Sequence, residues 1–591
     1  MTDAIATASP FAWRSRALGA LAASSARSNA HTSAHPFDLL VIGGGIVGCG
    51  VARDAALRGL KVALVEKGDF ASGTSSRSSR LVHGGVRYLE HGHLHLVFES
   101  SRERRRLLRL APHLVRPLSF TWPVYEGARV AQWKLLAGLT LYDALALFRN
   151  VGNHRRLTRE AVIAREPALT TLGLVGGATY WDAATDDARL TLANALGAAA
   201  AGATVLNYAE VTELVRGTGR ATGAIVRDLV SGREVTVRAR CLVSAAGPWT
   251  DALQRLEGPG APDALAPARA TAPRGANSDG DESDDELGVA APHAILGSAG
   301  THIAVARERV ANASAITLVA PQDGRVMFVL PAGEHAIIGT TETPARTGPD
   351  RIRATREEVR YLLNAVNANF PAAMLHDDDV VSAWAGIRPL AASLAEHEAG
   401  SASREHTIAV GAQGVLWVTG GKLTTYRAMA EDVVDRACAS LGLSDRPGRP
   451  NREIVLPGGA MQSLSATESD AGAAVGDEAI AVRLAGAYGS DWRQVWQPTR
   501  DDAALRERID DAHPYTIAEA AYAFSQEMAV TLGDVLVRRT HLAFEQRDHG
   551  LAAARRLAEK VAPRLGWDAA QVDVEVARYE RDVERLFSIG D

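Results

Sequence analysis

The sequence predicts an α/β fold in three parts: a Rossmann-like domain assembled from discontinuous segments, a domain built on an antiparallel sheet, and a C-terminal helical domain. Three observations predict it. A strand, a glycine turn, a helix and a second strand follow one another over residues 37–66. Short β-branched runs divided by turns fill much of residues 291–379, and helical spacing dominates after residue 446. A chain of 591 residues has room for two or three such domains.

Composition and charge exclude several classes of protein. The apolar share of 47% and the charged share of 23% are ordinary for a globular chain, and the net charge of −5 gives no basic excess that would favour nucleic acid. The three cysteines, Cys49, Cys241 and Cys438, stand far apart in no metal-ligand spacing. They fit a reducing compartment and predict neither a disulfide framework nor a metal site. The longest uncharged run, residues 190–209, is interrupted at Gly202, so it predicts a helix and then a strand rather than a membrane span.

Two segments have compositions typical of irregular structure. Residues 1–36 are rich in Ala, Ser, Arg and His, with Asp3 as the sole acid, which suits a disordered tail and also a targeting segment such as a transit peptide. Residues 256–290 combine Pro, Gly and Ala with an acidic run, which predicts a disordered acidic insert on the surface.

The stretch FDLLVIGGGIVGCGVARDAALRG, which begins at residue 37, is typical of a dinucleotide site. The apolar run at its start predicts a buried strand that leads into Gly43, Gly45 and Gly48, spaced as G-x-G-x-x-G. Gly43 permits the tight turn, Gly45 lets the backbone approach a pyrophosphate, and Gly48 lets helix and strand pack closely. A helix then starts at Ile46 and Val47, whose amides should face the phosphates.

The helix is expected to stop at Gly59, and a second strand ends on Glu66, followed by Lys67. The carboxylate of Glu66 can accept hydrogen bonds from a ribose diol. An acid at this position disfavours a 2′-phosphate, which makes NADP a poor candidate. The motif leaves the choice between NAD and FAD open.

A second glycine-containing segment, SGTSSRSSRLVHGGVRYLEHG at residues 72–92, follows the acid-tipped strand. Clusters of Ser and Gly are commonly solvated loops. This segment, however, emerges beside the predicted nucleotide site, where the hydroxyls of Thr74, Ser75 and Ser78 could hold the extended part of a larger cofactor.

Residues 74–92 closely resemble the flavin-proximal segment of the FAD-dependent glycerol-3-phosphate dehydrogenases, the quinone-linked respiratory enzymes of bacteria and mitochondria. The resemblance spans residues 37–460 in unbroken order, and LGDVLVRRTHLAFE at 532–545 resembles the C-terminal helical domain of the family. The other segments that carry it are DDARLTLANA, VSAAGPWTD, GTHIAVA, FVLP, IIGTTE, AGIRPL, VTGGKLTTYR and VLPGG. The chain departs from the family at Ala246, commonly Thr, at Glu342, commonly Asp, and before Gly300, where a basic residue is usual.

The resemblance implies FAD as the cofactor and fixes the expected domains. The FAD-binding domain should comprise residues 37–120, 180–255 and 380–445; the substrate domain 121–179 and 291–379; and the helical domain 446–591. The expected cofactor contacts are Gly43, Gly45, Ile46, Val47, Gly48, Glu66, Lys67, Thr74, Ser75, Ser78, Val82, Gly247, Trp249, Gly420, Lys422, Leu423 and Thr424.

The resemblance also implies the reaction: oxidation of sn-glycerol 3-phosphate to dihydroxyacetone phosphate by hydride transfer to FAD. A dianionic phosphate ester needs cations, and arginine binds phosphate bidentately. By resemblance, Arg87 and Arg388 point at the substrate and Arg404 at its phosphate. Surface ion pairing is the ordinary alternative for any one arginine.

Four further residues complete the expected site. Lys422 lies in the turn GGKLTT, where it could stabilise the reduced flavin or contact substrate. His302 is the candidate proton acceptor, because an imidazole titrates near neutral pH; the alternative is a hydrogen bond to the backbone, and His83 is a weaker rival. Tyr88 and Thr340 are expected to donate hydrogen bonds to substrate.

The family role further implies a membrane quinone as electron acceptor and contact with a membrane surface. Residues 129–148 are strongly apolar and residues 101–116 are basic, so together they could form an interfacial anchor. The expected location is the cytoplasmic face of a bacterial inner membrane, or the mitochondrial inner membrane if residues 1–36 are a transit peptide. Two other functions stay open, an oxidase that uses O2 and a catalytically silent flavin-binding scaffold. A homodimer also stays open.

Overall fold

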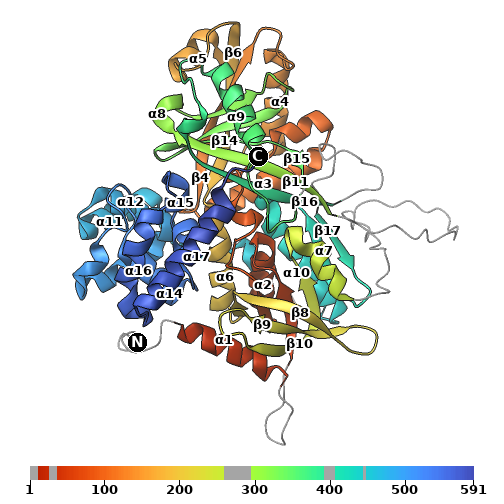
Figure 1. The fold of residues 1–591 in the computed structure, drawn as a ribbon. Coiled ribbons are helices and arrows are strands. Elements are labelled where there is room, and N and C mark those ends of the chain that lie inside the picture. The colour runs from red at the N-terminus through yellow and green to blue at the C-terminus, as the bar shows by residue number, and fades with distance from the viewer. Residues whose placement is uncertain (1–10, 26–35, 258–294, 346, 392–405, 444–447) are drawn as a thin grey trace, which may run out of the picture.

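The computed structural model describes residues 11–25, 36–257, 295–345, 347–391, 406–443 and 448–591 (Figure 1). It contains two large sheets and a separate body of helices, so the expected α/β class and its three parts are confirmed. Most of the predicted acidic insert, residues 258–290, lies outside the described residues, as does Arg404.

The first sheet is the Rossmann-like core. Its strands run in the order β17-β18-β10-β1-β2-β7, and each neighbouring pair is parallel except β17 with β18. β8 and β9 extend β10 as an antiparallel ribbon. The bounds are β1 Phe37–Ile42, β2 Val62–Val65, β7 Thr204–Leu206, β8 Ala209–Arg216, β9 Ala221–Asp228, β10 Glu234–Ser244, β17 His406–Val410 and β18 Leu416–Gly420.

The uninterrupted apolar run of β1 is explained by burial on both faces. Leu39 and Val41 pack with α2 (Ile46–Leu57) and α10 (Tyr426–Ser440), which lie beside α6 (Asp187–Ala200). Leu40 and Ile42 point to the opposite face and pack with the ribbon of β8, β9 and β10. A parallel strand covered on both sides must be apolar at every position. The predicted helix end at Gly59, which has φ 78°, is confirmed.

The second sheet runs in the order β15-β11-β14-β13-β12-β4-β6-β3, with β16 on β11 and β5 on β6. Each pair is antiparallel except β12 with β4. The bounds are β3 Leu81–Val82, β4 Val115–Tyr125, β5 Arg155–Thr158, β6 Leu174–Thr185, β11 Ile295–Ala306, β12 Ala315–Val319, β13 Val326–Ala332, β14 His335–Gly339, β15 Thr343–Pro344 and β16 Val380–Ala391.

This sheet takes more of the chain than the sequence predicted. The boundaries expected at residues 120, 180 and 380 fall within β4, β6 and the start of β16, all of which belong to the second sheet. The chain passes from one domain to the other within these long strands. The amino-acid composition does not change inside a strand, so the sequence gives no signal for the domain boundary. The helices beside the sheet are α3 Leu94–Leu110, α4 Gln132–Leu145, α5 Arg159–Arg165, α8 Arg307–Val310 and α9 Arg356–Asn369. Helix α7, Thr250–Gln254, packs instead with the core of the first sheet.

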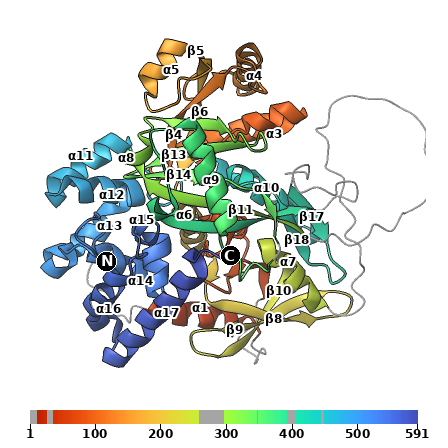
Figure 2. The same ribbon diagram turned by 45° about the horizontal axis from the view of Figure 1, so that its top comes forward.

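The C-terminal helices form the third body, which lies against both others in the two views (Figures 1 and 2). Thr516 and Glu519 have the spacing of a capping box, and the box is present at the start of α14. The last helix of the chain is α17. The bounds are α11 Leu464–Val475, α12 Glu478–Tyr488, α13 Trp492–Trp496, α14 Ile517–Gln526, α15 Leu542–Glu545, α16 Leu551–Leu565 and α17 Ala569–Phe587.

The expectation of a disordered tail over residues 1–36 is wrong for Ala12–Ala23, which form helix α1. Arg14 is buried and pairs with Asp228, and it also donates to the carbonyl of Asn207 at 2.8 Å. Leu21 is buried in the core of the first sheet. The composition of this segment is weakly apolar, and only these distant partners give the helix a surface to dock on.

Candidate functional site

The carboxyl ends of β1, β10 and β18 meet at one edge of the first sheet, since these strands are parallel neighbours. Their three following turns hold Gly43, Gly247 and Gly420, and all three line one cavity of about 1110 Å³. Ligands of doubly wound sheets bind at this edge. The volume exceeds the ~300–1,000 Å³ typical of small-ligand pockets, so the cavity can hold an extended dinucleotide together with a small substrate.

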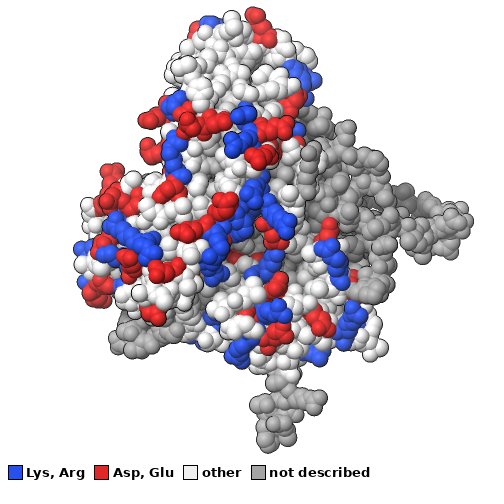
Figure 3. Space-filling model, in the orientation of Figure 1, with Lys and Arg blue, Asp and Glu red and all other residues white. Residues whose placement is uncertain are grey.

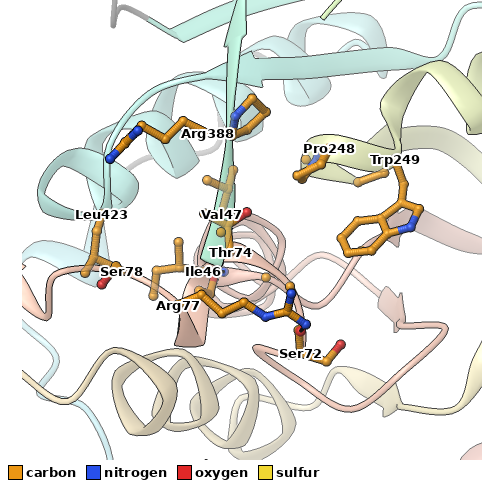
Figure 4. A pocket seen from close by; sticks show the side chains of 18 of the residues that line it. Ile46, Val47, Ser72, Thr74, Arg77, Ser78, Pro248, Trp249, Arg388 and Leu423 are labelled. Atoms are coloured by element: carbon orange, nitrogen blue, oxygen red, sulfur yellow. Dashed lines mark hydrogen bonds between the residues drawn. The ribbon is translucent and has the colours of Figure 1, made fainter. Parts of the chain in front are cut away.

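The first glycine turn has the geometry that the motif predicts. Gly43 has φ 110°, and a Cβ there would lie 2.5 Å from the carbonyl oxygen of Ala245 in the neighbouring turn. A Cβ on Gly48 would overlap the carbonyl oxygen of Gly43, so Gly48 serves the packing of α2 on β1 and lies behind the cavity. Gly45, Ile46 and Val47 line the cavity at the positive end of α2. Figure 4 shows the side chains of Ile46 and Val47 there.

Glu66 closes one end of the cavity. Its two carboxylate oxygens accept hydrogen bonds from the amides of Gly44 at 2.6 Å and Gly68 at 2.7 Å. Burial raises the pKa of this carboxyl above its ordinary value in spite of these bonds. The ammonium of Lys67 lies 4.6 Å from the centre of the Trp249 ring, and both residues line the same end. This end therefore presents an acceptor and an aromatic face, as an adenosine requires.

The segment of residues 72–92 runs along the cavity, and its hydroxyls also hold it in place. Thr74 donates to the carbonyl of Ile387 at 2.6 Å, and Ser78 donates to Asp187 at 2.6 Å. Ser75 accepts the Ile46 amide at 3.0 Å. These three line the cavity, whereas Val82 and Thr424 are absent from its described wall. Thr424 instead bonds to the backbone of His83, so it joins this segment to the turn that holds Lys422.

The opposite end of the cavity is a face of the second sheet. The strand register places Trp384 and Gly339 on either side of His302, and Phe328 follows Gly339 on the next strand. His302 stacks on Trp384 with ring centres 5.5 Å apart and planes 11° apart. A Cβ on Gly339 would overlap the His302 ring, which explains the glycine of the IIGTT segment.

The expectation that His302 titrates near neutral pH is wrong. Burial, with smaller contributions from the positive charges of Arg388 and Arg80, lowers the pKa of its imidazole to about 3. His302 is only 3% exposed, so the charged form loses its hydration. The imidazole is therefore neutral at physiological pH in the structure.

Arg388 lies along this wall and lines the cavity (Figure 4). Its guanidinium donates to the hydroxyl of Thr340 at 3.0 Å and to the hydroxyl of Ser298 at 3.4 Å. A Cβ on Gly300, on the neighbouring strand, would overlap the guanidinium. These bonds hold the guanidinium of Arg388 against the wall, in a space that a glycine keeps open.

Lys422 and Tyr88 come together as a pair. The ammonium of Lys422 lies 3.9 Å from the centre of the Tyr88 ring, and both residues line the cavity with Gly420 and Leu423. The cation therefore lies where the second glycine turn meets the segment of residues 72–92. The described structure does not extend to the side chain of Arg87 or to Arg404, so their roles stay predictions.

Sequence reasoning missed several residues of the wall. Arg325 donates to Glu342 at 2.8 Å across the sheet end of the cavity. Ser79 bonds to His302. The C-terminal helices contribute Arg538, Arg578, Asp582 and Arg585 near Arg77. The run of hydroxyls and cations in residues 74–80 was the available signal for Ser79 and Arg77, but nothing local marks residues that reach the cavity from α17.

These features fit an FAD. The cradle needs glycine at positions 43 and 48, an acid faces the ribose end, and polar donors and a lysine lie at the far end. Among the described residues, no group of three or more His, Cys, Asp or Glu side chains is arranged to hold a metal ion.

Comparisons with known proteins agree with this geometry. Residues 38–427 match the family model described as FAD dependent oxidoreductase, and residues 451–572 match the C-terminal domain of alpha-glycerophosphate oxidase. A protein named glycerol-3-phosphate dehydrogenase 2 from Mycobacterium tuberculosis is 38% identical over 93% of this chain and 88% of its own length. The human mitochondrial glycerol-3-phosphate dehydrogenase is 34% identical over 92% of this chain and 72% of its own.

A solved structure is similar over nearly the whole chain. The glycerol-3-phosphate dehydrogenase of Bacillus halodurans, determined in complex with FAD, superposes with a TM-score of 0.75 at 28% identity. The match covers 98% of each chain.

Proposed function

The chain belongs to the family of FAD-dependent glycerol-3-phosphate dehydrogenases, and from that premise we propose that it oxidises sn-glycerol 3-phosphate to dihydroxyacetone phosphate and passes the electrons to a membrane quinone. One observation carries the proposal. The two glycine turns that bracket an FAD in this family open into the same cavity as Arg388, His302 and Lys422.

Residues at different positions along the cavity have different proposed roles. Bound FAD would supply the ring that accepts a hydride from C2 of the substrate. Arg388 lies across the sheet wall with Thr340 and can pair with the phosphate dianion through its planar fork. Phe328, a half-buried aromatic residue of the cavity wall, can exclude water from the reacting carbon. Lys422 places a cation at the second glycine turn, where negative charge on the cofactor would be stabilised.

An anaerobic reduction experiment tests the proposal. The purified holoenzyme is mixed with glycerol 3-phosphate without oxygen, and the visible absorbance of its flavin is followed. Bleaching is the expected result, and its absence would support the silent scaffold. Arg388→Ala should retain FAD, because the cofactor cradle lies on other strands, yet lose most of the bleaching rate. An Arg388→Ala variant that bleaches at the wild-type rate would remove Arg388 from the site.

An oxidase is the second candidate, because residues 451–572 match a domain named for alpha-glycerophosphate oxidase. The two functions differ in the acceptor that re-oxidises the reduced flavin, O2 for an oxidase and quinone for a dehydrogenase. Reduced enzyme is mixed with air-saturated buffer or with a soluble quinone, and the return of flavin absorbance is timed. A dehydrogenase should prefer quinone. Rapid peroxide formation without a preference for quinone would establish the oxidase.

We also propose that the protein attaches to a membrane surface through α4, with the cytoplasmic face of a bacterial inner membrane as the favoured location. Exposed apolar side chains gather along α4 and the segment after it, at Trp133 (74% exposed), Leu141, Leu147, Phe148 (60%) and Val151. Charged residues are also sparse over the end of the molecule where β6 and α5 lie (Figure 3). In the described chain, no helix is both long and apolar enough to cross a bilayer.

The expectation that residues 101–116 form the second part of the membrane anchor is partly wrong. The helix in this segment ends at Leu110, and Arg104 within it is buried in an ion pair with Asp182. Glu103 is likewise buried, against Arg427 at 2.6 Å. These bonds commit one face of α3 to the protein interior, so α4 carries the proposed attachment.

Sedimentation with vesicles of phosphatidylglycerol and phosphatidylcholine tests this attachment. Changing both Trp133 and Phe148 to Ser should reduce the sedimenting fraction, because burial of exposed apolar area drives interfacial binding. Val230→Ser, which alters a side chain 51% exposed at the turn before β10, is the matched control. Equal loss in both proteins would contradict the assignment to α4.

A further inference from the structure

His302 is fixed on three sides by elements far apart in the sequence. Its ring stacks on Trp384 of β16 and lies over Gly339 of β14. On the third side, its Nε2 atom is 2.8 Å from the hydroxyl oxygen of Ser79, which belongs to the segment of residues 72–92. Ser79 and His302 both line the cavity. The hydrogen bond therefore joins the wall of the substrate domain to the segment that runs beside the cofactor.

The other ring nitrogen defines the tautomer. Nδ1 of His302 is buried, and no hydrogen-bond partner lies within reach among the described residues. A neutral imidazole carries one N–H and one bare nitrogen. A buried N–H without an acceptor is much rarer in proteins than an unused acceptor. The proton is therefore assigned to Nε2, which donates to the Ser79 oxygen and leaves Nδ1 bare.

This arrangement determines the orientation of the Ser79 hydroxyl. Because its oxygen accepts from His302, its own hydrogen is left to donate elsewhere, and the cavity is the open side. The guanidinium of the next residue, Arg80, lies 5.9 Å from the ring centre of Trp384 and 4.9 Å from that of Phe544. Arg80 therefore packs against the same tryptophan on which His302 stacks. The His302 ring cannot turn without disturbing its stack on Trp384 and its contact with Gly339.

We propose that Ser79 is a substrate-contacting residue that donates a hydrogen bond to a hydroxyl or carbonyl oxygen of the three-carbon substrate, and that His302 is the positioning residue that orients it. This inference rests on the proposed function. It assigns to His302 a role that a neutral, enclosed imidazole can perform, and it replaces the expectation that His302 itself removes the substrate proton.

The substitution His302→Gln separates the two roles. A glutamine amide places an N–H donor close to the position of Nε2, so it can still donate to Ser79, but it cannot accept a proton as a base. The measurement is the anaerobic rate of flavin bleaching at saturating glycerol 3-phosphate, with the substrate dissociation constant taken from its concentration dependence. We expect His302→Gln to retain the rate within about fivefold, whereas loss of a general base lowers rates by ~10²–10⁴.

Ser79→Ala should lower the bleaching rate or weaken substrate binding by about tenfold, because one hydrogen bond to substrate is removed. Ser79→Thr, which keeps the hydroxyl, should restore most of the loss. The double variant Ser79→Ala, His302→Gln should be no worse than Ser79→Ala alone, since His302 acts through Ser79. Ser76→Ala, a buried hydroxyl on the same segment, is the matched control.

Three outcomes would overturn the inference. They are a loss of ~10² or more in His302→Gln with Ser79→Ala unaffected, a double variant with fully additive losses, and Ser79→Ala indistinguishable from Ser76→Ala. Bound flavin per protein is measured for every variant, so that a cofactor defect is recognised as such. A wild-type protein that does not bleach would contradict the proposed function, whereas a bleaching wild type with an inert Ser79→Ala contradicts this inference alone.

Discussion

At the scale of single residues, the site is shaped as much by missing side chains as by present ones. Gly300 and Gly339 lie on the cavity face of their strands, where any Cβ would overlap Arg388 or His302. Neither has a positive φ, so the conformation itself would accept other residues. Their identity is explained by the large groups on the neighbouring strands, which occupy the space beside them.

The first prediction concerns Gly300→Ala. The new methyl group would displace the Arg388 guanidinium from its bonds with Thr340 and Ser298. We expect the KM for glycerol 3-phosphate to rise roughly 10- to 100-fold, equivalent to ~1.4–2.7 kcal/mol, with bound FAD unchanged. Steady-state kinetics and the flavin-to-protein absorbance ratio measure this. Gly348→Ala, where a Cβ meets nothing within 4 Å, should behave as wild type; an unchanged KM in Gly300→Ala would refute the argument.

At the scale of elements, two glycines in the unit formed by β1, the glycine turn and α2 have different functions. Gly45 lines the cavity, and a Cβ there would meet only the hydroxyl of Ser75 at 3.3 Å. Gly48 lies behind the turn, where a Cβ would overlap the backbone of Gly43. The first glycine therefore serves the ligand and the second serves the packing of helix on strand.

The second prediction follows from this difference. Gly45→Ala should weaken FAD binding while the stability of the apoprotein stays near wild type. Gly48→Ala should lose FAD and also destabilise the apoprotein by ~1–3 kcal/mol, the usual range for overpacking. Fluorescence titration of apoprotein with FAD and urea unfolding of the apoproteins separate the two effects. Equal unfolding midpoints for the two variants would show that Gly48 has no packing role.

At the scale of the whole molecule, Asp69 joins the first-sheet domain to the C-terminal helices near the cofactor end. It accepts from Arg538 at 2.6 Å and from Arg539 on the C-terminal helices. It also accepts from Asn207 at 2.9 Å on the first sheet. Asp69 and both arginines are buried, with Arg538 the most exposed at 7%, and Asp69 and Arg538 line the cavity. Docking of the helical domain is thus linked to the segment that follows Glu66.

The third prediction is that Asp69→Asn will destabilise the protein by ~3–5 kcal/mol, because two buried guanidinium groups lose their shared negative charge. Thermal unfolding and limited proteolysis of the C-terminal domain measure the effect. Asp470→Asn is the control. It removes an exposed pair with Arg493 at 2.5 Å and should change the stability by no more than ~1 kcal/mol. Similar losses in the two variants would contradict the role of Asp69.

The fourth prediction concerns the pH dependence of stability. Burial lowers the pKa of His113, like that of His302, to about 3 in the folded protein, against an ordinary value of 6.5. Between these values the unfolded chain binds a proton that the folded chain excludes, so stability falls as pH falls from 6.5 towards 3. Each histidine should contribute a loss of about 2 kcal/mol at pH ~5.

Asp54 acts with the opposite sign, because burial raises its pKa to about 6 and its protonation favours the folded state as pH falls. Asp54 is present in both His113→Gln and wild type, so its contribution to the pH dependence cancels when the two are compared. Urea unfolding at pH ~7.5 and ~5 should show a pH-induced loss smaller by about 2 kcal/mol in His113→Gln. An identical loss in both proteins would mean that His113 is protonated in the folded state.

The sequence by itself determined the local devices of this protein. The glycine spacing, the apolar run of β1, the acid at Glu66 and the capping box at Thr516 are all set by neighbours within a few residues, so they could be predicted with their positions. The family segments identified the cavity-lining positions of Arg388, Lys422 and His302 in the same way.

Only the tertiary structure decided how these residues behave. The low pKa of His302 depends on burial beneath strands far away in the chain, and its contact with Ser79 crosses between domains. The docking of α1 through Arg14 and the approach of Arg538 to the cavity likewise join residues about 200 to 470 positions apart. Burial and long-range charge depend on which segments meet, and a linear pattern does not contain that information.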